Sequence, residues 1–286
     1  MIEDNQGVAQ TPPPRPPKNH RLTNRDIQLL QLLSEYGCVD AERIKVKLWN
    51  ANPNSRAHFR RLGILKKMKL VENVLGDQGF GLGYRISKQG LKLLTDNGQT
   101  VDHARTRRGY GTQFEHDQLL IQIRTILEKS PVVREFMTEA KVRDELLGVQ
   151  KGPVDWKTAP TIPDGTFVYE VPGQRLRIAL ELEMTQKSQA RYFKILRNHM
   201  LNRKWEMAFY IVRDDSFMRR LLELADEVRR EDATVRVAKR INDLYFCSLE
   251  KFLANELKVQ FTNGEKEISL DDLAQKAQGK RPSNYG

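Results

Sequence analysis

Apolar residues recur at helical spacing near the start of the chain. In RLTNRDIQLLQLLSEYGCVD they run from Ile27 to Leu33 at intervals of three, with Thr23 as a candidate N-cap and Gly37 as a helix end. CVDAERIKVKLWN and NPNSRAHFRRLGILKKMKLVEN predict two more helices, LVENVLGDQGFGLGYRIS a hairpin around a glycine-rich centre, and SKQGLKLLTDNG a further helix. This order predicts a winged helix-turn-helix domain over residues 21–97.

The second half of the chain alternates between helical and strand-like patterns. A helix is predicted in QFEHDQLLIQIRTILEKS, and REFMTEAKVRDELLG is compatible with another. The period then changes to two in DGTFVYEV and LRIALELEMT, which predict two strands joined by the turn PGQR. QKSQARYFKILRNHMLNRK and SFMRRLLELADEVRRE predict helices, WEMAFYIVRDD and ATVRVAKR strands, and LYFCSLEKFL a strand or a helix. Residues 113–262 are therefore expected to form a mixed α/β domain.

Polar or proline-rich segments flank the two predicted domains. Residues 1–20 contain TPPPRPP and predict a disordered tail, because proline lacks an amide donor and has a fixed φ. Residues 98–112 are polar and contain glycine, so they predict a linker, and residues 263–286 predict a polar C-terminal tail. The overall expectation is an α+β, mixed protein of two domains.

Composition and net charge indicate what kind of molecule the protein binds and where it is located. The chain has 286 residues and a net charge of +11, which favours an anionic partner such as double-stranded DNA over the alternative of a generally basic soluble protein. No run approaches the roughly 18 apolar residues that span a bilayer, and the N-terminus lacks the apolar core of a secretory signal. Cys38 and Cys247 match no metal spacing, so reduced thiols, a cytoplasmic location and no membrane contact are expected.

A basic run without acidic residues covers the third predicted helix. In a winged helix this helix enters the major groove of DNA, and cations on it bind phosphates and can read guanine. The alternative is a solvated basic face on a protein-interaction domain. Phe59, Leu62 and Leu65 are expected in the core. The predicted DNA-binding residues are Arg56, His58, Arg60, Arg61, Lys66, Lys67 and Lys69.

Acidic residues gather around the two predicted strands of the second domain. Asp164 precedes the first strand, and Glu181 and Glu183 share one face of the second, because alternate side chains of a strand point the same way. Carboxylate oxygens suit Mg²⁺ or Mn²⁺, so these three side chains are the candidate metal ligands. Lys187 is expected in the first turn of the next helix, with Thr185 as its N-cap. The alternative is a solvated outer face of an edge strand.

The segment PDG…ALELEMTQKSQARY resembles PD-(D/E)XK nucleases, in which an acidic residue in a PD step precedes a strand carrying E-x-K. Together with LTNRDIQLLQLLSEYGCVDAERI, RRLGILKKMKLVE and FEHDQLLIQIR, it resembles plasmid replication-relaxation proteins and MobC-type relaxases over roughly residues 21–215. The resemblance implies a winged helix-turn-helix joined to a PD-(D/E)XK nuclease-like α/β domain. Glu183 stands where this motif has lysine, so either Lys187 supplies the lysine or the domain lacks the chemistry. In this fold Glu115 and His116 lie on the helix beside the site, where either can act as an extra ligand or base.

Two functions remain open from the sequence. The first is a metal-dependent, site-specific DNA endonuclease or nickase of a plasmid or integrative element, acting with other mobilisation or replication proteins. Its catalytic site would consist of Asp164, Glu181, Glu183 and Lys187. The second is a non-catalytic origin-binding accessory or transcription regulator; for both, a homodimer is left open. A tyrosine-type relaxase is disfavoured because the five histidines form no cluster, so Tyr192 is expected in the core or at a phosphate.

Overall fold

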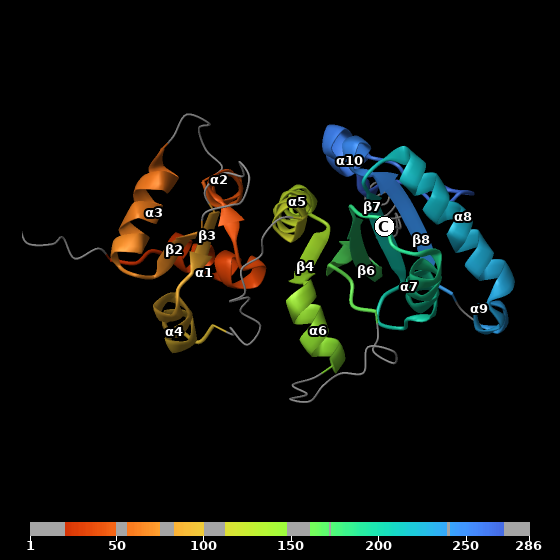
Figure 1. Cartoon of the computed structure of the whole chain (residues 1–286), viewed down its shortest axis with the longest axis horizontal. Helices are drawn as coiled ribbons and strands as arrows, with labels where there is room; N and C mark the ends of the chain where they lie inside the picture. Colours follow the sequence, from red (N-terminus) through yellow and green to blue (C-terminus); the bar gives the residue numbers. More distant parts are fainter. Residues whose placement is uncertain are drawn as a thin grey trace, which may run out of the picture.

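The computed structural model describes residues 21–49, 56–74, 83–99, 112–147, 161–171, 173–238 and 241–271. These residues form helices and two separate sheets, one of three strands and one of seven, so the expected mixed α and β composition is confirmed (Figure 1). The N-terminal tail predicted over residues 1–20 and most of the linker predicted over 98–112 lie outside the described residues.

The first unit contains four helices around the three-stranded sheet. Strand β3 lies between β1 and β2 and is antiparallel to both, so the predicted hairpin is confirmed at its two strands; its centre, residues 75–82, lies outside the described part. The elements are α1 (Asn24–Tyr36), β1 (Val39–Asp40), α2 (Ala41–Leu48), α3 (Ala57–Lys67), β2 (Val71–Val74), β3 (Gly83–Ile86) and α4 (Lys88–Asp96).

Local signals explain where the first two helices begin and end. The Thr23 side chain accepts a hydrogen bond from the Asp26 amide, and the Asp26 carboxylate accepts one from the Thr23 amide, which forms a capping box. Gly37 ends α1 with a φ of 76°, a left-handed value that glycine adopts without a Cβ clash. Asp40 caps α2 by accepting from the Arg43 amide.

The second unit is built on the seven-stranded sheet, in the order β10-β9-β8-β7-β6-β5-β4. The pairs β4–β5 and β5–β6 are antiparallel, whereas β6–β7 and β7–β8 are parallel. Its elements are α5 (Thr112–Leu127), β4 (Val133–Thr138), α6 (Glu139–Leu147), β5 (Gly165–Val171), β6 (Gln174–Glu183), α7 (Gln189–Leu201), β7 (Met207–Val212), α8 (Asp215–Glu231), α9 (Ala233–Val237), β8 (Asp243–Ser248), α10 (Leu249–Asn255), the 3₁₀ helix η1 (Glu256–Lys258), β9 (Phe261–Thr262) and β10 (Glu267–Ile268).

Helices cover both faces of the sheet (Figure 1). On β6, Ile178, Leu180 and Leu182 pack in the apolar cluster that contains the buried side chains of α5, while Ala179 packs in the cluster formed with α7 and α8. Glu181 follows the same alternation as Ala179 and therefore lies on the α7 side. A central strand covered on both faces is mostly apolar, so a carboxylate there is unusual.

Three local predictions for the second unit are corrected, and LYFCSLEKFL, for which the sequence leaves strand and helix open, contains one of each. ATVRVAKR contains the short helix α9 in place of a strand, capped by Asp232. REFMTEAKVRDELLG divides into β4 and α6, and LYFCSLEKFL into β8 and α10. The C-terminal tail predicted from residue 263 begins too early, because β10 continues the sheet and Leu270 is 1% exposed. REFMTEAKVRDELLG and LYFCSLEKFL each contain a change from strand to helix, which a short window does not locate, whereas the alternation in ATVRVAKR is typical of a strand although a helix forms there.

Helix α5 joins the two units. Its apolar residues share one continuous core with leucines of α1 and isoleucine Ile44 of α2. The Gln118 side chain donates to the Cys38 carbonyl at 2.9 Å and accepts from the Asp40 amide at 3.0 Å, which extends the hydrogen bonding of β1. Arg124 donates to Glu35 at 2.7 Å. The helix that begins the second unit therefore also completes the packing of the first.

Candidate functional site

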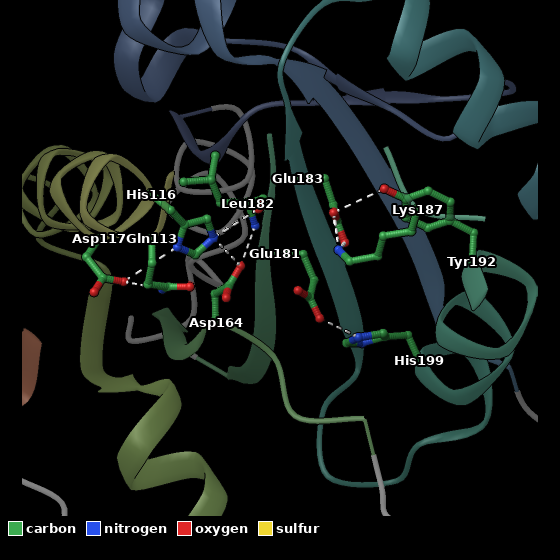
Figure 2. Close-up of polar contacts among 10 residues, drawn as sticks. All are labelled: Gln113, His116, Asp117, Asp164, Glu181, Leu182, Glu183, Lys187, Tyr192 and His199. Carbon is green, nitrogen blue, oxygen red and sulfur yellow. Dashed lines mark hydrogen bonds and ion pairs between the residues drawn. The ribbon is translucent and has the colours of Figure 1, made fainter. Parts of the chain in front are cut away.

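The predicted acidic residues meet at the end of strand β6. Strand β5 begins just after Asp164 and runs antiparallel to β6, with Gly165 paired to Leu180. Asp164 therefore lies beside the C-terminal end of β6, where its Oδ2 accepts a hydrogen bond from the Leu182 amide at 2.8 Å. Figure 2 shows the side chains of Glu181 and Glu183 leaving β6 towards α7.

A pocket of about 960 Å³ opens at this point. Glu181 and Glu183 are only 7% and 3% exposed, and β6 lies between β5 and β7. The alternative of a solvated edge strand is therefore wrong, because both carboxylates are buried on a central strand. The predicted residues that line the pocket are Glu115, His116, Asp164, Glu181, Glu183 and Lys187.

Glu183 is held by two partners that the sequence also singled out. The Lys187 ammonium pairs with both carboxylate oxygens, and the Tyr192 hydroxyl donates to Oε2 at 3.1 Å (Figure 2). Burial raises the pKa of Glu183, and the charge of Lys187 opposes this only in part. Lys187 precedes α7 and does not lie in its first turn, because Ser188, not Thr185, is the N-cap.

Glu181 has a partner that the sequence analysis missed. Nε2 of His199, a fully buried residue of α7, lies 2.8 Å from Oε1 of Glu181. Burial lowers the pKa of His199 to about 3, so the imidazole is neutral. Burial, then the charges of Asp164 and Glu183, raises the pKa of Glu181 well above its usual value. The seven-residue spacing between Tyr192 and His199, two helical turns, was the available signal.

His116 is a cation in this site. Its Nε2 lies 3.3 Å from Oδ2 of Asp164 and 3.1 Å from the Leu182 carbonyl, and its Nδ1 lies 3.6 Å from Asp117 (Figure 2). Burial disfavours the imidazolium, but hydrogen bonds and charge from the two aspartates outweigh it and raise the pKa of His116 to about 10. A protonated histidine is not a general base at neutral pH, so His116 neutralises Asp164. Glu115 is exposed at the pocket rim.

The pocket suits a divalent cation in the chemistry of its side chains but not in their arrangement. Three carboxylates on one pocket supply the oxygen ligands that Mg²⁺ and Mn²⁺ prefer. Within the described ranges, however, no three His, Cys, Asp or Glu side chains are arranged to hold one ion. The reason is visible in the pairing, since Glu183 is bound by Lys187, Glu181 by His199 and Asp164 by a backbone amide.

The basic helix α3 separates into an exposed face and a packed face. His58 is 2% exposed and lies against Phe59 and Trp49, so it does not face solvent as a DNA ligand would. Phe59, expected in the core, is 46% exposed, whereas Leu62 and Leu65 are fully buried as expected. The helix begins at Ala57 after Arg56. The exposed predicted DNA-binding residues are Arg56, Arg60, Lys66, Lys67 and Lys69.

Arg61 belongs to the fold of the first unit. Its Nε donates to Oδ1 of Asp26 at 2.6 Å, and its Nη2 donates to Oδ2 of Asp26 and to the Arg21 carbonyl. Asp26 is fully buried, so this bidentate pair neutralises a carboxylate inside the protein. The prediction of Arg61 as a DNA ligand is therefore replaced by a structural role.

Comparison of the chain with family models, curated proteins and solved structures finds no match. Across the described segments, none of the helices combines the length and the apolar character that crossing a bilayer requires.

Proposed function

We propose that the protein binds double-stranded DNA through α3 and the β2–β3 hairpin, which act as the recognition helix and wing of a winged helix-turn-helix. The support is the order of the elements and the exposed cations of α3, with Arg56 and Arg60 one helical turn apart. Phosphate contacts by these side chains give affinity by releasing counterions. Arg60, exposed in mid-helix, is the best-placed residue for a bidentate contact to guanine.

We further propose that the second unit is a PD-(D/E)XK-like, metal-dependent DNA endonuclease that acts as a site-specific nickase. The single observation that carries this proposal is the meeting of Asp164, Glu181, Glu183 and Lys187 in one pocket at the end of β6. The PD step at the start of one strand and the acidic pair on its neighbour are the pattern through which the sequence resembles these nucleases.

Each residue has a role in the proposed reaction. Asp164, Glu181 and Glu183 would hold Mg²⁺ or Mn²⁺, which supplies charge stabilisation at the phosphate and lowers the pKa of a bound water. Lys187 would leave Glu183 and donate to a phosphate oxygen, which replaces the lysine missing at position 183 of the motif. Tyr192, buried and hydrogen-bonded to Glu183, keeps that carboxylate in place.

The biological setting follows from the resemblance alone. Plasmid replication-relaxation proteins and MobC-type relaxases imply the mobilisation or replication of a plasmid or integrative element. In that setting the protein acts in the cytoplasm on DNA, together with other mobilisation or replication proteins.

A second candidate is a DNA-binding protein of the same architecture that does not cut, acting at an origin or as a transcription regulator. The observation that favours it is the Lys187–Glu183 ion pair, which neutralises one prospective ligand. The described residues also lack a ready three-ligand group. The two candidates share the DNA-binding role and differ only in the second unit.

Nicking of supercoiled DNA separates the candidates. The DNA carries a site selected by the protein from a random library, and the reaction contains Mg²⁺ or Mn²⁺, with EDTA as the negative control. The endonuclease predicts conversion to open circles by wild type and none by Asp164→Asn or Glu181→Gln, while both variants keep DNA binding. Glu170→Gln is the matched control, because Glu170 is an exposed carboxylate near the other end of β5. Binding without nicking by wild type establishes the non-catalytic candidate.

A further inference from the structure

One wall of the acidic pocket is lined with cations. Lys187, Arg191 and Lys194 come from the start of α7 and the loop before it, and Arg213 from the loop after β7. The floor beside them carries Glu181 and is acidic. We propose that this basic wall binds the sugar-phosphate backbone of the DNA strand that enters the pocket. The proposal rests on the proposed function, because it assigns a substrate contact to the same site.

The helical geometry of α7 places the wall on one face. Arg191 and Lys194 are three residues apart, which makes them neighbours on the helix surface, and both are exposed. Tyr192 and Leu196, on the opposite side of the helix, are buried in the apolar cluster that α7 forms with α8 and the sheet. The packing of these two side chains fixes which face of α7 is turned to the pocket.

Neutralisation of a pocket carboxylate accounts for one cation of the wall, because Lys187 pairs with Glu183. Each carboxylate of the floor has its own partner: Glu181 bonds to His199 and Glu183 to Lys187. The exposed side chains of Arg191 and Lys194 line the same pocket, where an anionic ligand from solvent can reach them.

A phosphodiester backbone fits the basic wall of the pocket. Its successive phosphates are anions that Lys and Arg bind, and counterion release makes such binding sequence-independent. The exposed side chain of Arg213, which is 55% accessible and bonded to Asp214, extends the wall towards α8. A small anion would need only one such cation, whereas a row along α7 suits a chain of phosphates.

The test is the salt dependence of DNA binding by the full chain with Arg191→Ala and Lys194→Ala combined. Fluorescence anisotropy with labelled duplex DNA is measured in EDTA, so that no strand is cut. The loss of two phosphate contacts is expected to reduce the slope of log K against log salt by about 1.8, so the ratio of wild-type to variant affinity is expected to change about tenfold over a fourfold change in salt concentration. The matched control is Lys258→Ala with Lys266→Ala, an equal loss of charge at the far edge of the sheet from the pocket.

The possible results are distinct. A reduced slope in the α7 variant and an unchanged slope in the control support the basic wall. Equal slopes in wild type and the α7 variant, or an equal loss in the control, overturn it. Because binding is measured without cleavage, the two proposals can be separated. A reduced slope in a protein that never nicks DNA contradicts the proposed endonuclease and supports the basic wall. An unchanged slope in a protein that nicks DNA supports the endonuclease and contradicts the basic wall.

Discussion

Replacing Arg61 and Arg60 separately by alanine is expected to give opposite results, although the two residues are adjacent. Arg61→Ala removes both guanidinium hydrogen bonds to Asp26, a carboxylate that is fully buried. Removing one partner of a buried ion pair costs about 3–5 kcal/mol. Asp26 keeps two hydrogen bonds from Thr23, at 2.6 and 2.7 Å, so we expect a smaller loss of about 2–3 kcal/mol.

Urea denaturation followed by circular dichroism measures this loss. With a dependence on urea of about 2 kcal/mol per M, the midpoint for Arg61→Ala falls by about 1 M. The hydrogen bonds from Arg61 and Thr23 outweigh the burial that disfavours the ionised Asp26, so its folded pKa lies below the usual 3.8. Its contribution to stability is therefore present above that pH and is lost as the pH falls through the folded value. The difference between wild type and Arg61→Ala is expected to shrink in the same window.

Arg60→Ala is the matched variant. Its side chain is exposed, so the unfolding midpoint is expected to stay at the wild-type value. The slope of log K for duplex DNA against log salt is expected to fall by about 0.9, the value for one phosphate contact. An Arg61→Ala protein that unfolds like wild type but loses salt dependence would refute the assignment of Arg61 to the fold. An unchanged slope for Arg60→Ala would show that Arg60 does not contact a DNA phosphate.

Three further variants test other parts of the structure. Glu35→Gln is expected to destabilise the protein above about pH 4.5 and to match the stability of wild type in more acidic buffer. The reason is that two cations outweigh burial and lower the folded pKa of Glu35. Urea denaturation from pH 3 to 7 measures the difference. Gly90→Ala should cost about 1–3 kcal/mol in the same assay, since its Cβ would lie 2.4 Å from the Leu70 carbonyl oxygen; Gly63→Ala, where the Cβ meets nothing within 4 Å, is the control. His199→Phe should retain the ring packing but weaken Mn²⁺ binding in calorimetry, because Glu181 loses its orienting partner; unchanged binding would show that the contact does not position the carboxylate.

The shared core has a consequence for the predicted independence of the first domain. The residue 1–97 fragment lacks α5, and with it the Gln118 side chain that bonds to Cys38 and Asp40. If residues 21–97 form an independent domain, as the sequence predicts, the residue 1–97 fragment folds and binds DNA as well as a fragment that ends after Leu127. A large gain in helical circular dichroism and melting temperature for the longer fragment, beyond the helix it adds, would show that α5 is needed for the first unit.

The ends of the first helices and the alternation of side chains along a strand could be predicted from the sequence alone. The N-cap at Thr23 and the helix end at Gly37 act as expected, and the cap at Asp40 is equally local, because the partners of each lie within four residues. The alternation over β6 placed Glu181 and Glu183 on one face, since a strand's period fixes the direction of its side chains. Asp164 lies beside them because β5 and β6 pair with Gly165 opposite Leu180.

Only the tertiary structure decided which charged groups are paired inside the protein. His199 meets Glu181 across 18 residues, and Arg61 meets Asp26 across 35. The helical spacing of Tyr192 and His199 shows that they share a face of α7, but it does not show which side chain that face meets. The same holds for Phe59, whose helical spacing suggested the core, although the packing of α3 leaves it exposed. Periodicity records which face of an element is apolar, whereas the partner of a buried polar atom depends on how separate elements are brought together in space.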